Sequence, residues 1–168
     1  MRAVCLRQSL PSHVKGEDVK SVYPVGTTIY DPAQCSNGYT IISGSGVVKL
    51  VDMNGVVAHN WSVDPDKQHG FIHRARLLND GKLMLLFGPR GDTKGCVAEF
   101  DWQGERTWSY TPEHYPHHDF WPKENGNVLL ICTMEVPEEA KQKITDPERR
   151  EAKILDDCLI EVDRNGSI

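Results

Sequence analysis

The sequence repeats itself with a period of about 45 residues, and this periodicity restricts the possible folds more than any other feature. Three segments consist of an Asn-Gly or Asp-Gly dipeptide followed by an apolar run, and their glycines, Gly38, Gly81 and Gly126, stand 43 and then 45 residues apart. A period of roughly 20–50 residues is typical of propellers, solenoids and other repeat architectures. We therefore expect each period to form one structural module.

A second marker repeats out of phase with the first. It is an apolar residue, an aspartate, two variable residues and a glycine, at 51–55, 100–104 and 162–166. The aspartate can accept a hydrogen bond from the backbone two residues on, and glycine supplies the positive φ that a short hairpin loop needs. Trp61 and Trp108 follow the first two of these turns. Each period is thus predicted to contain four short antiparallel strands, with a tryptophan filling the gap between neighbouring sheets.

Four short strands in about 45 residues are typical of a β-propeller blade. The predicted fold is therefore all-β, with an N-terminal leader at 1–21 and blades at 22–65, 66–112 and 113–168. A β-sandwich also has short strands, but it would not explain two interleaved markers with one period. Three blades cannot close a ring, so we expect the remaining blades to come from another chain or from a missing C-terminal part, within a larger assembly.

The third period is stretched between Thr133 and Asp156 by a segment dense in acidic and basic residues. Asp146 and Pro147 are suited to the N-cap and the first position of a helix. The sequence therefore predicts a short helical insertion in the third blade. The insertion is interpreted either as a solvated loop or as a lid or subunit contact.

Composition excludes several functions. The net charge of −5 argues against nucleic acid as a partner, because phosphate binding needs clustered Lys and Arg. No run of about 18 apolar residues is present, and the first residues lack the apolar stretch of a secretory signal. We expect a soluble, cytoplasmic protein with no membrane contact. Five scattered cysteines without C-x-x-C spacing indicate reduced thiols.

The repeat also sorts the seven histidines. His73 and His118 each lie eight residues before the glycine of their turn dipeptide, and Tyr30 has the same place in the first period. Equivalent positions of a repeat should face the same region. If the strand before each dipeptide is the innermost one, these three side chains line a central channel.

The segment from Tyr115 to Trp121 holds the densest group of functional side chains. Alternation along a strand puts His117 and Asp119 on the face opposite His118 unless a bulge intervenes. An adjacent carboxylate can orient an imidazole and stabilise its protonated form. The candidate catalytic residues are therefore His118, His73, His117 and Asp119. Tyr30 and Arg76 are the candidate substrate-binding residues.

At these residues the sequence resembles the bacterial arylsulfotransferase family. The resemblance spans about residues 22–168, and it depends on 26–32 with 37–40, on 50–61, and on 117–119 before 125–127. It implies a six-bladed propeller that moves a sulfuryl group from an aryl sulfate to a phenol, without a nucleotide donor or another cofactor. It also implies that His118 binds sulfate or acts as an acid or base, and that the nucleophilic histidine belongs to a later blade.

Two alternatives stay open at this point. The same inward histidines could be the ligands of a metal-dependent enzyme, although no tight spacing such as H-E-x-x-H assigns a ligand set. The chain could also be a non-catalytic propeller that acts as a binding scaffold and uses the charged insertion as its contact.

Overall fold

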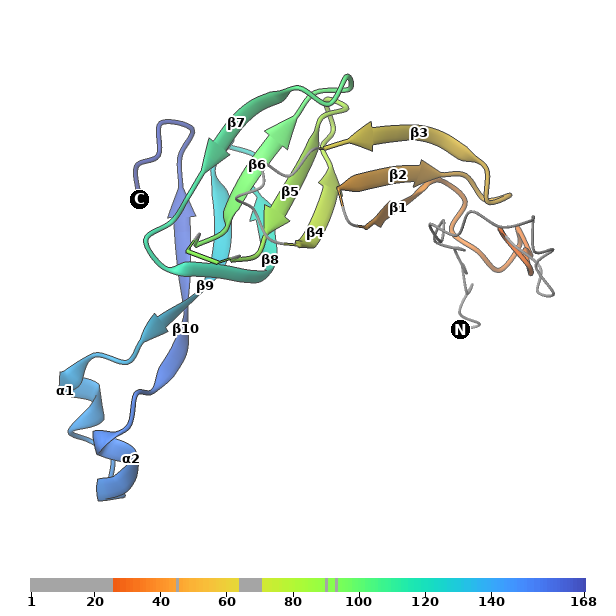
Figure 1. Cartoon of the computed structure of the whole chain (residues 1–168). Helices are drawn as coiled ribbons and strands as arrows, with labels where there is room; N and C mark the ends of the chain where they lie inside the picture. The colour runs from red at the N-terminus through yellow and green to blue at the C-terminus, as the bar shows by residue number, and fades with distance from the viewer. Residues whose placement is uncertain (1–25, 45, 64–70, 90, 93) are drawn as a thin grey trace, which may run out of the picture. The chain divides into compact units, whose positions relative to one another are not determined.

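A computed structural model describes residues 26–44, 46–63, 71–89, 91–92 and 94–168. The predicted leader at 1–21, Cys5, His13 and His69 lie outside these residues. The described chain forms three separate antiparallel sheets (Figure 1). The first has the order β1 (Thr40–Ser43), β2 (Val47–Val51), β3 (Val57–Ser62). The second has the order β4 (Ile72–Leu77), β5 (Leu83–Phe87), β6 (Cys96–Phe100), β7 (Arg106–Tyr110). The third has the order β10 (Leu155–Val162), β9 (Val128–Glu135), β8 (Tyr115–Pro122).

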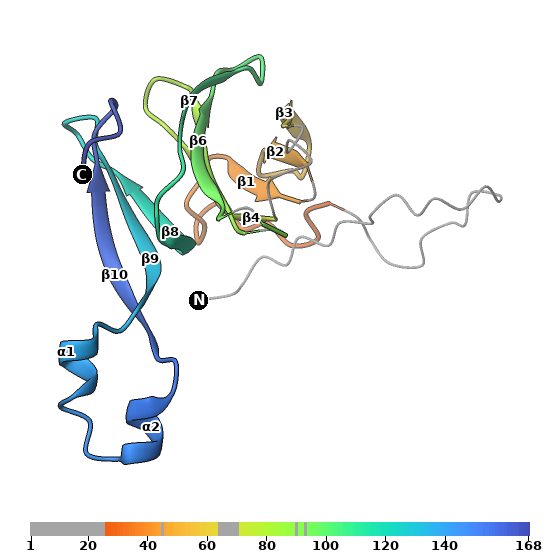
Figure 2. The same cartoon turned by 60° about the vertical axis from the view of Figure 1, so that its left-hand side comes forward.

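The all-β prediction is confirmed, and within the described ranges no sheet closes on itself. The chain divides into two compact units. The first unit consists of the chain up to Ile42 together with Lys49–Asn60. The second unit consists of Ser43–Val48 together with Trp61–Ile168. These boundaries cut across the predicted blade ranges, which stay a prediction. The second unit holds the whole of the β4–β7 and β8–β10 sheets, which lie side by side (Figure 2).

The aspartate-glycine turns have the predicted structure in all three periods. In the first turn the Gly55 N–H donates to the Asp52 carbonyl oxygen at 3.1 Å, and Asp52 Oδ1 accepts from Asn54 N at 2.9 Å. Gly55 has φ 84°. The same backbone and side-chain bonds recur at 101–105 and 163–167. Each loop is a tight turn followed by a left-handed glycine, which joins two strands of right-handed twist.

The other turns differ between periods. Gly81 and Gly126 have φ 84° and 87° and close the β4–β5 and β8–β9 hairpins, but Gly38 is not left-handed. Residues 27–39 contain no strand, so the predicted inner strand of the first period, which was to carry Tyr30, is wrong. Asp31 bonds the backbone N–H of Ala33 at 3.1 Å, and Pro32 has no N–H to give to a ladder. A local turn therefore wins over strand pairing in this segment.

The core of the second unit lies between its two sheets. It includes the following buried side chains: Met84, Leu86, Val97, Phe120, Val128, Leu130, Cys132, Ile160 and Val162. Both repeat tryptophans occupy the predicted place between sheets. The indole N–H of Trp61 donates to the Asp101 carbonyl oxygen at 3.1 Å, and that of Trp108 donates to the Arg164 carbonyl oxygen at 2.9 Å. Each indole thus bonds the backbone of the aspartate-glycine turn in the next period.

The charged insertion forms an arm at the end of the β9–β10 hairpin (Figure 1). It carries α1 (Glu138–Lys141) and α2 (Pro147–Glu151), and neither helix has a buried residue. Asp146 caps α2 by accepting from Glu148 N at 3.0 Å, with Pro147 in the first turn, so the predicted helix is confirmed. Neither helix of the described chain has the length and apolar character needed to cross a membrane.

The cysteines of the described residues, Cys35, Cys96, Cys132 and Cys158, are free thiols. Cys96 and Cys132 are buried, and Cys158 is half-buried against the core. Burial raises the pKa of the Cys132 thiol to about 12, which makes it an unreactive core residue.

Candidate functional site

Two β-bulges carry the candidate histidines. In the β4–β5 ladder Ile72 pairs with Phe87 and Arg74 with Leu86, so His73 between them has no partner. In the β8–β9 ladder Pro116 pairs with Cys132 and Phe120 with Leu130, so residues 117–119 all oppose Ile131. A bulge leaves the extra residue unpaired and re-aims its side chain. Both histidines with equivalent places in the repeat therefore lie in bulges, although the β4 bulge has one unpaired residue and the β8 bulge has three residues opposite one.

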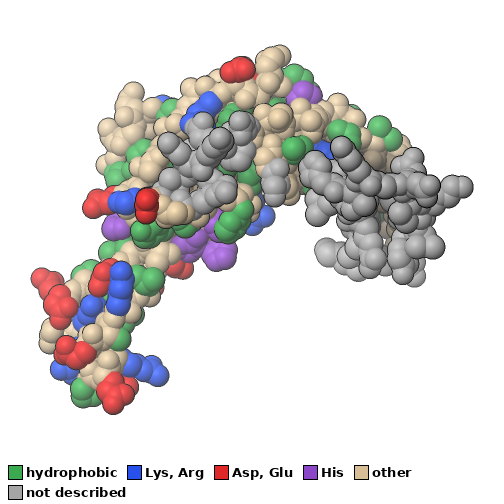
Figure 3. Space-filling model, viewed as in Figure 1, with side chains coloured by type: hydrophobic (Ala, Val, Ile, Leu, Met, Phe, Trp, Pro, Cys, Tyr) green, Lys and Arg blue, Asp and Glu red, His purple; other side chains and the backbone are tan. Residues whose placement is uncertain are grey.

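The bulges bring three imidazoles together. The ring centroids of His73 and His118 are 6.0 Å apart, and those of His117 and His118 are 4.9 Å apart. Phe71 packs against His73 at 4.4 Å. Figure 3 shows histidine side chains gathered on one part of the surface. We call His73, His117 and His118 the histidine cluster. Its place in a central channel stays a prediction.

His118 has a strained backbone. Its φ of 58° is the only positive value for a non-glycine residue in the described chain. A left-handed conformation costs such a residue about 1–3 kcal/mol and persists only where the surroundings impose it. Strain of this kind concentrates at active sites and ligand clamps. His118 is also exposed, so a ligand can reach its ring.

His73 is set up as a neutral imidazole. Burial lowers the pKa of His73 below its usual 6.5, and the neighbouring His118 and His117 lower it further. The ring lies so close to the backbone that a Cβ on Gly88 would stand 2.5 Å from His73 Nε2. The sequence analysis missed Gly88, although a glycine at a strand end often marks a close approach. A neutral imidazole offers one donor and one acceptor to a ligand.

Asp119 does not orient an imidazole, contrary to the interpretation based on its place in the sequence. Its Oδ1 accepts from Arg76 Nη2 at 2.9 Å and from the Phe120 N–H at 2.8 Å, and Arg74 Nε lies 3.2 Å away. Burial alone would raise the pKa of Asp119, but the Phe120 N–H and Arg76 outweigh it, so the pKa lies below its usual value. Asp119 is therefore an ionised link between β8 and β4.

The carboxylate that contacts an imidazole is Asp157, from β10. Its Oδ1 lies 3.1 Å from His117 Nε2. The other ring nitrogen of His117, Nδ1, is buried without a hydrogen-bond partner among the described residues. The sequence analysis missed Asp157, because it meets His117 only through the pairing of β10 with β9 and the bulge in β8.

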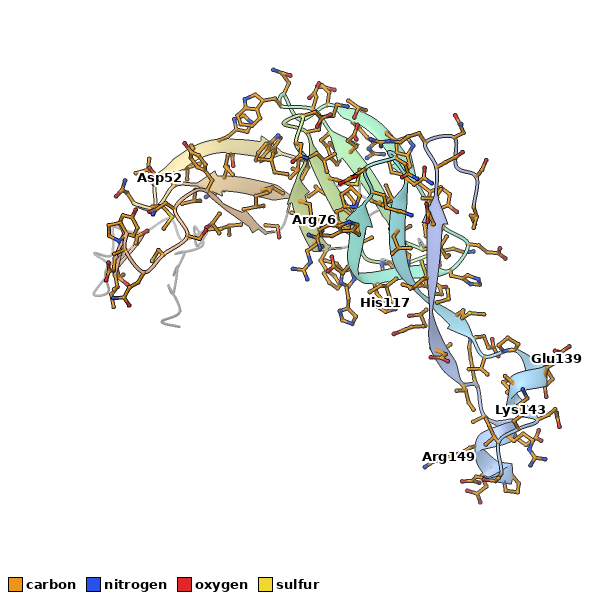
Figure 4. The ribbon with its side chains drawn as sticks, turned by 180° about the vertical axis from the view of Figure 1, so that it is seen from behind. Asp52, Arg76, His117, Glu139, Lys143 and Arg149 are labelled. Atoms are coloured by element: carbon orange, nitrogen blue, oxygen red, sulfur yellow. The ribbon has the colours of Figure 1, made fainter. Side chains whose placement is uncertain are left out.

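The two predicted substrate-binding residues have different surroundings. Arg76 lies on β4 with its guanidinium 4.8 Å from the Trp121 ring, on the same side of the unit as His117 (Figure 4). Tyr30 lies in the first compact unit, where its hydroxyl donates to Asn37 Oδ1. The role of Tyr30 beside the histidines stays a prediction.

Metal ligation gains no support from this geometry. Across the residues described, no group of three or more His, Cys, Asp and Glu side chains is arranged to hold a metal ion.

Comparison with known proteins identifies the chain at family level. No curated protein matches it. One solved structure, a protein of unknown function from Bacteroides caccae, is 17% identical, with a TM-score of 0.46 over 77% of this chain. This chain spans 40% of that protein's length, and the likeness is too low to support an argument. The model of the family described as "Arylsulfotransferase (ASST)" matches residues 32–168. Since this match covers most of the sequence, including the whole histidine cluster, the chain belongs to the arylsulfotransferase family.

Proposed function

We propose that this chain is part of a nucleotide-independent arylsulfotransferase, which moves a sulfuryl group from an aryl sulfate to a phenol. The observation that carries the proposal is the 6.0 Å distance between the ring centroids of His73 and His118, which lie in bulges of consecutive sheets at equivalent places in the repeat. Family membership supports the general class of reaction.

The histidine cluster suits the needs of sulfuryl transfer. In the first step a nucleophilic nitrogen attacks sulfur, the bond from sulfur to the aryl oxygen breaks, and a phenolate leaves. In the second step the acceptor phenol attacks sulfur, loses its proton to a base, and releases the nitrogen. Imidazole N–H groups can stabilise the charge on the sulfuryl oxygens, and a neutral imidazole such as His73 can take the phenol proton. The nucleophilic histidine itself comes from a later blade.

We further propose that the sheets are blades of a six-bladed propeller. The repeated bond from each tryptophan to the next turn supports this, because it joins consecutive sheets in the same way. Leu129 and Ile131 on β9 stand 45 residues after Met84 and Leu86, which the β8–β10 sheet covers. A further blade, in this polypeptide or another, would cover Leu129 and Ile131 in the same manner.

The test is sulfate transfer by the purified protein in its native assembly. The protein is incubated with 4-nitrophenyl sulfate and a phenol, with release of 4-nitrophenolate and the mass of the sulfated acceptor as readouts. His118→Asn and His73→Asn should each lower kcat/KM by about 10²–10⁴-fold, the usual contribution of acid–base and charge-stabilising groups. His114→Asn is the matched control, because the ring contacts of the cluster join His73, His117 and His118 and do not include His114.

Failure of several donor and acceptor pairs to give any product would contradict the proposal. So would full activity of both cluster variants. Elemental analysis of unchelated protein adds a separate check, since a stoichiometric metal lost with activity in either variant would point to the metal-dependent alternative.

A further inference from the structure

We propose that Arg76 and Asp119 form a positioning pair that holds the left-handed backbone of His118 and sets its distance from His73. The pair joins β4, which carries His73, to β8, which carries His118. This role replaces the direct substrate contact expected of Arg76. It rests on the proposed function only where it predicts an effect on catalysis.

The Asp119 side of the pair closes the bulge. Asp119 follows His118 directly, and its Oδ1 accepts from the N–H of the next residue, Phe120, at 2.8 Å. Phe120 is the residue at which β8 resumes its pairing, opposite Leu130. The carboxylate thus bonds the backbone where the chain returns from the bulge to the ladder, which fixes the peptide between Asp119 and Phe120 and so the chain that leaves His118.

The Arg76 side holds the three residues that follow His118. Its guanidinium makes two bonds to Asp119, at 2.9 and 3.1 Å, and its Nε donates to the Phe120 carbonyl oxygen at 2.9 Å. The same group stacks on Trp121 at 4.8 Å. A planar guanidinium fixes both distance and orientation in such a contact, whereas a lysine would supply only a point charge.

These contacts engage Arg76 within the protein. Its Nε and Nη2 groups are bonded to β8, and its side chain is 29% exposed. Arg76 also stands three residues after His73 on the same strand, so a shift of β8 against Arg76 is a shift of His118 against His73. The pair therefore controls the geometry of the histidine cluster from outside it.

The first test measures the cluster directly. Arg76→Lys and Asp119→Asn are compared with the unchanged protein by NMR titration of the His73 ring nitrogens. Burial lowers the pKa of His73 most, and the neighbouring His118 and His117 lower it further. If the pair positions His118, both variants should change the pKa of His73, and Arg76→Lys, which keeps its positive charge, should move it toward its ordinary value.

A matched control separates positioning from general loosening. The buried carboxylate of Glu99 on β6 binds Arg164, so this pair joins the same two sheets at a site away from the histidines. Glu99→Gln should weaken the junction without moving the titration of His73. An equal shift in Glu99→Gln, or no shift in either pair variant, would overturn the proposal.

The second test divides the kinetic effect. A positioning role predicts that Arg76→Lys lowers kcat by about 10–100-fold with KM nearly constant, as a misplaced group does. A rise in KM with kcat unchanged would make Arg76 a substrate-binding residue and reject the proposal. If the unchanged protein transfers no sulfate, the proposed function fails while the His73 titration still decides the positioning role.

Discussion

The β4–β7 and β8–β10 sheets come from the same sequence repeat, yet they bury their residues differently. Every residue of β5 and β6 is buried, whereas β9 alternates between buried and half-buried positions from Val128 to Thr133 and ends in the exposed Glu135. Met84 and Leu86 are covered, while their equivalents Leu129 and Ile131 stay partly open. The repeat therefore determines the hairpins and bulges of each sheet, whereas the neighbouring layers determine how much of each face is buried.

The tryptophan contacts differ in a similar way. The Trp61 ring meets Trp102 at 5.2 Å, and the Trp108 ring meets the Arg164 guanidinium at 4.8 Å. Trp102 and Arg164 each follow the aspartate of their turn directly. Because both indoles bond a backbone carbonyl, the side chain packed on them is free to vary. The two junctions between sheets therefore share the hydrogen bond from an indole to a turn carbonyl, and they differ in the side chain that packs on the tryptophan.

The largest loss of stability should come from replacing the two tryptophans that join the sheets. Trp61→Ala should lower the free energy of unfolding by about 3–5 kcal/mol, since Trp61 is fully buried and loses its packing and its hydrogen bond. Trp108→Ala should cost less, because Trp108 is only half-buried. Urea unfolding of the two variants measures both values. Equal losses would show that the two junctions do not differ as described.

A smaller loss of stability is expected from replacing Arg164, whose guanidinium packs on Trp108. Arg164→Ala removes a partner of the buried Glu99 carboxylate but leaves Lys82 Nζ 3.2 Å away and Thr107 bonded to it. We expect a loss of roughly 2 kcal/mol, below the usual cost of breaking a buried ion pair, because these partners remain. Trp102→Ala at the first junction is the matched comparison in the same urea series. A negligible loss for Arg164→Ala would show that Arg164 covers Trp108 without supporting Glu99.

The turns allow a sharper comparison between periods. Gly81→Ala and Gly126→Ala should each cost about 1–2 kcal/mol, because alanine is strained at their positive φ. Gly38→Ala should be neutral or stabilise by up to about 1 kcal/mol, since Gly38 is not left-handed and has open space around it. Thermal unfolding monitors all three. A large loss of stability in Gly38→Ala would show that Gly38 adopts the left-handed turn conformation that the sequence predicts.

The smallest effect concerns the dependence of stability on pH through His73. The pKa of His73 is lowered in the folded state, so the unfolded chain binds a proton more readily below pH 6.5. Stability should therefore be complete above that pH and fall as the pH drops toward the folded-state pKa. His73→Asn should flatten this decline in melting temperature between pH 7.5 and 5.5. An unchanged slope would show that burial of His73 does not perturb its titration.

Most of the local structure could be predicted from the sequence. The aspartate-glycine turns, the cap at Asp146 and the place of Trp61 depend on residues close in the chain or on the repeat itself. The predictions from sequence failed where hydrogen bonds within a segment competed with hydrogen bonds to distant residues. Asp31 and Pro32 form a turn in place of a strand, and Asp119 bonds arginines of another sheet in place of its neighbouring histidine.

The all-β repeat, the turn chemistry and the equivalent places of His73 and His118 follow from the sequence alone. The partners of the histidine cluster follow from the three-dimensional arrangement: Gly88 lies against the His73 ring, Asp157 lies beside His117, and Arg76 bonds the residues after His118. The physical reason is that turns and caps use bonds within a few residues, whereas a bulge shifts register and changes which distant side chains come within hydrogen-bonding distance.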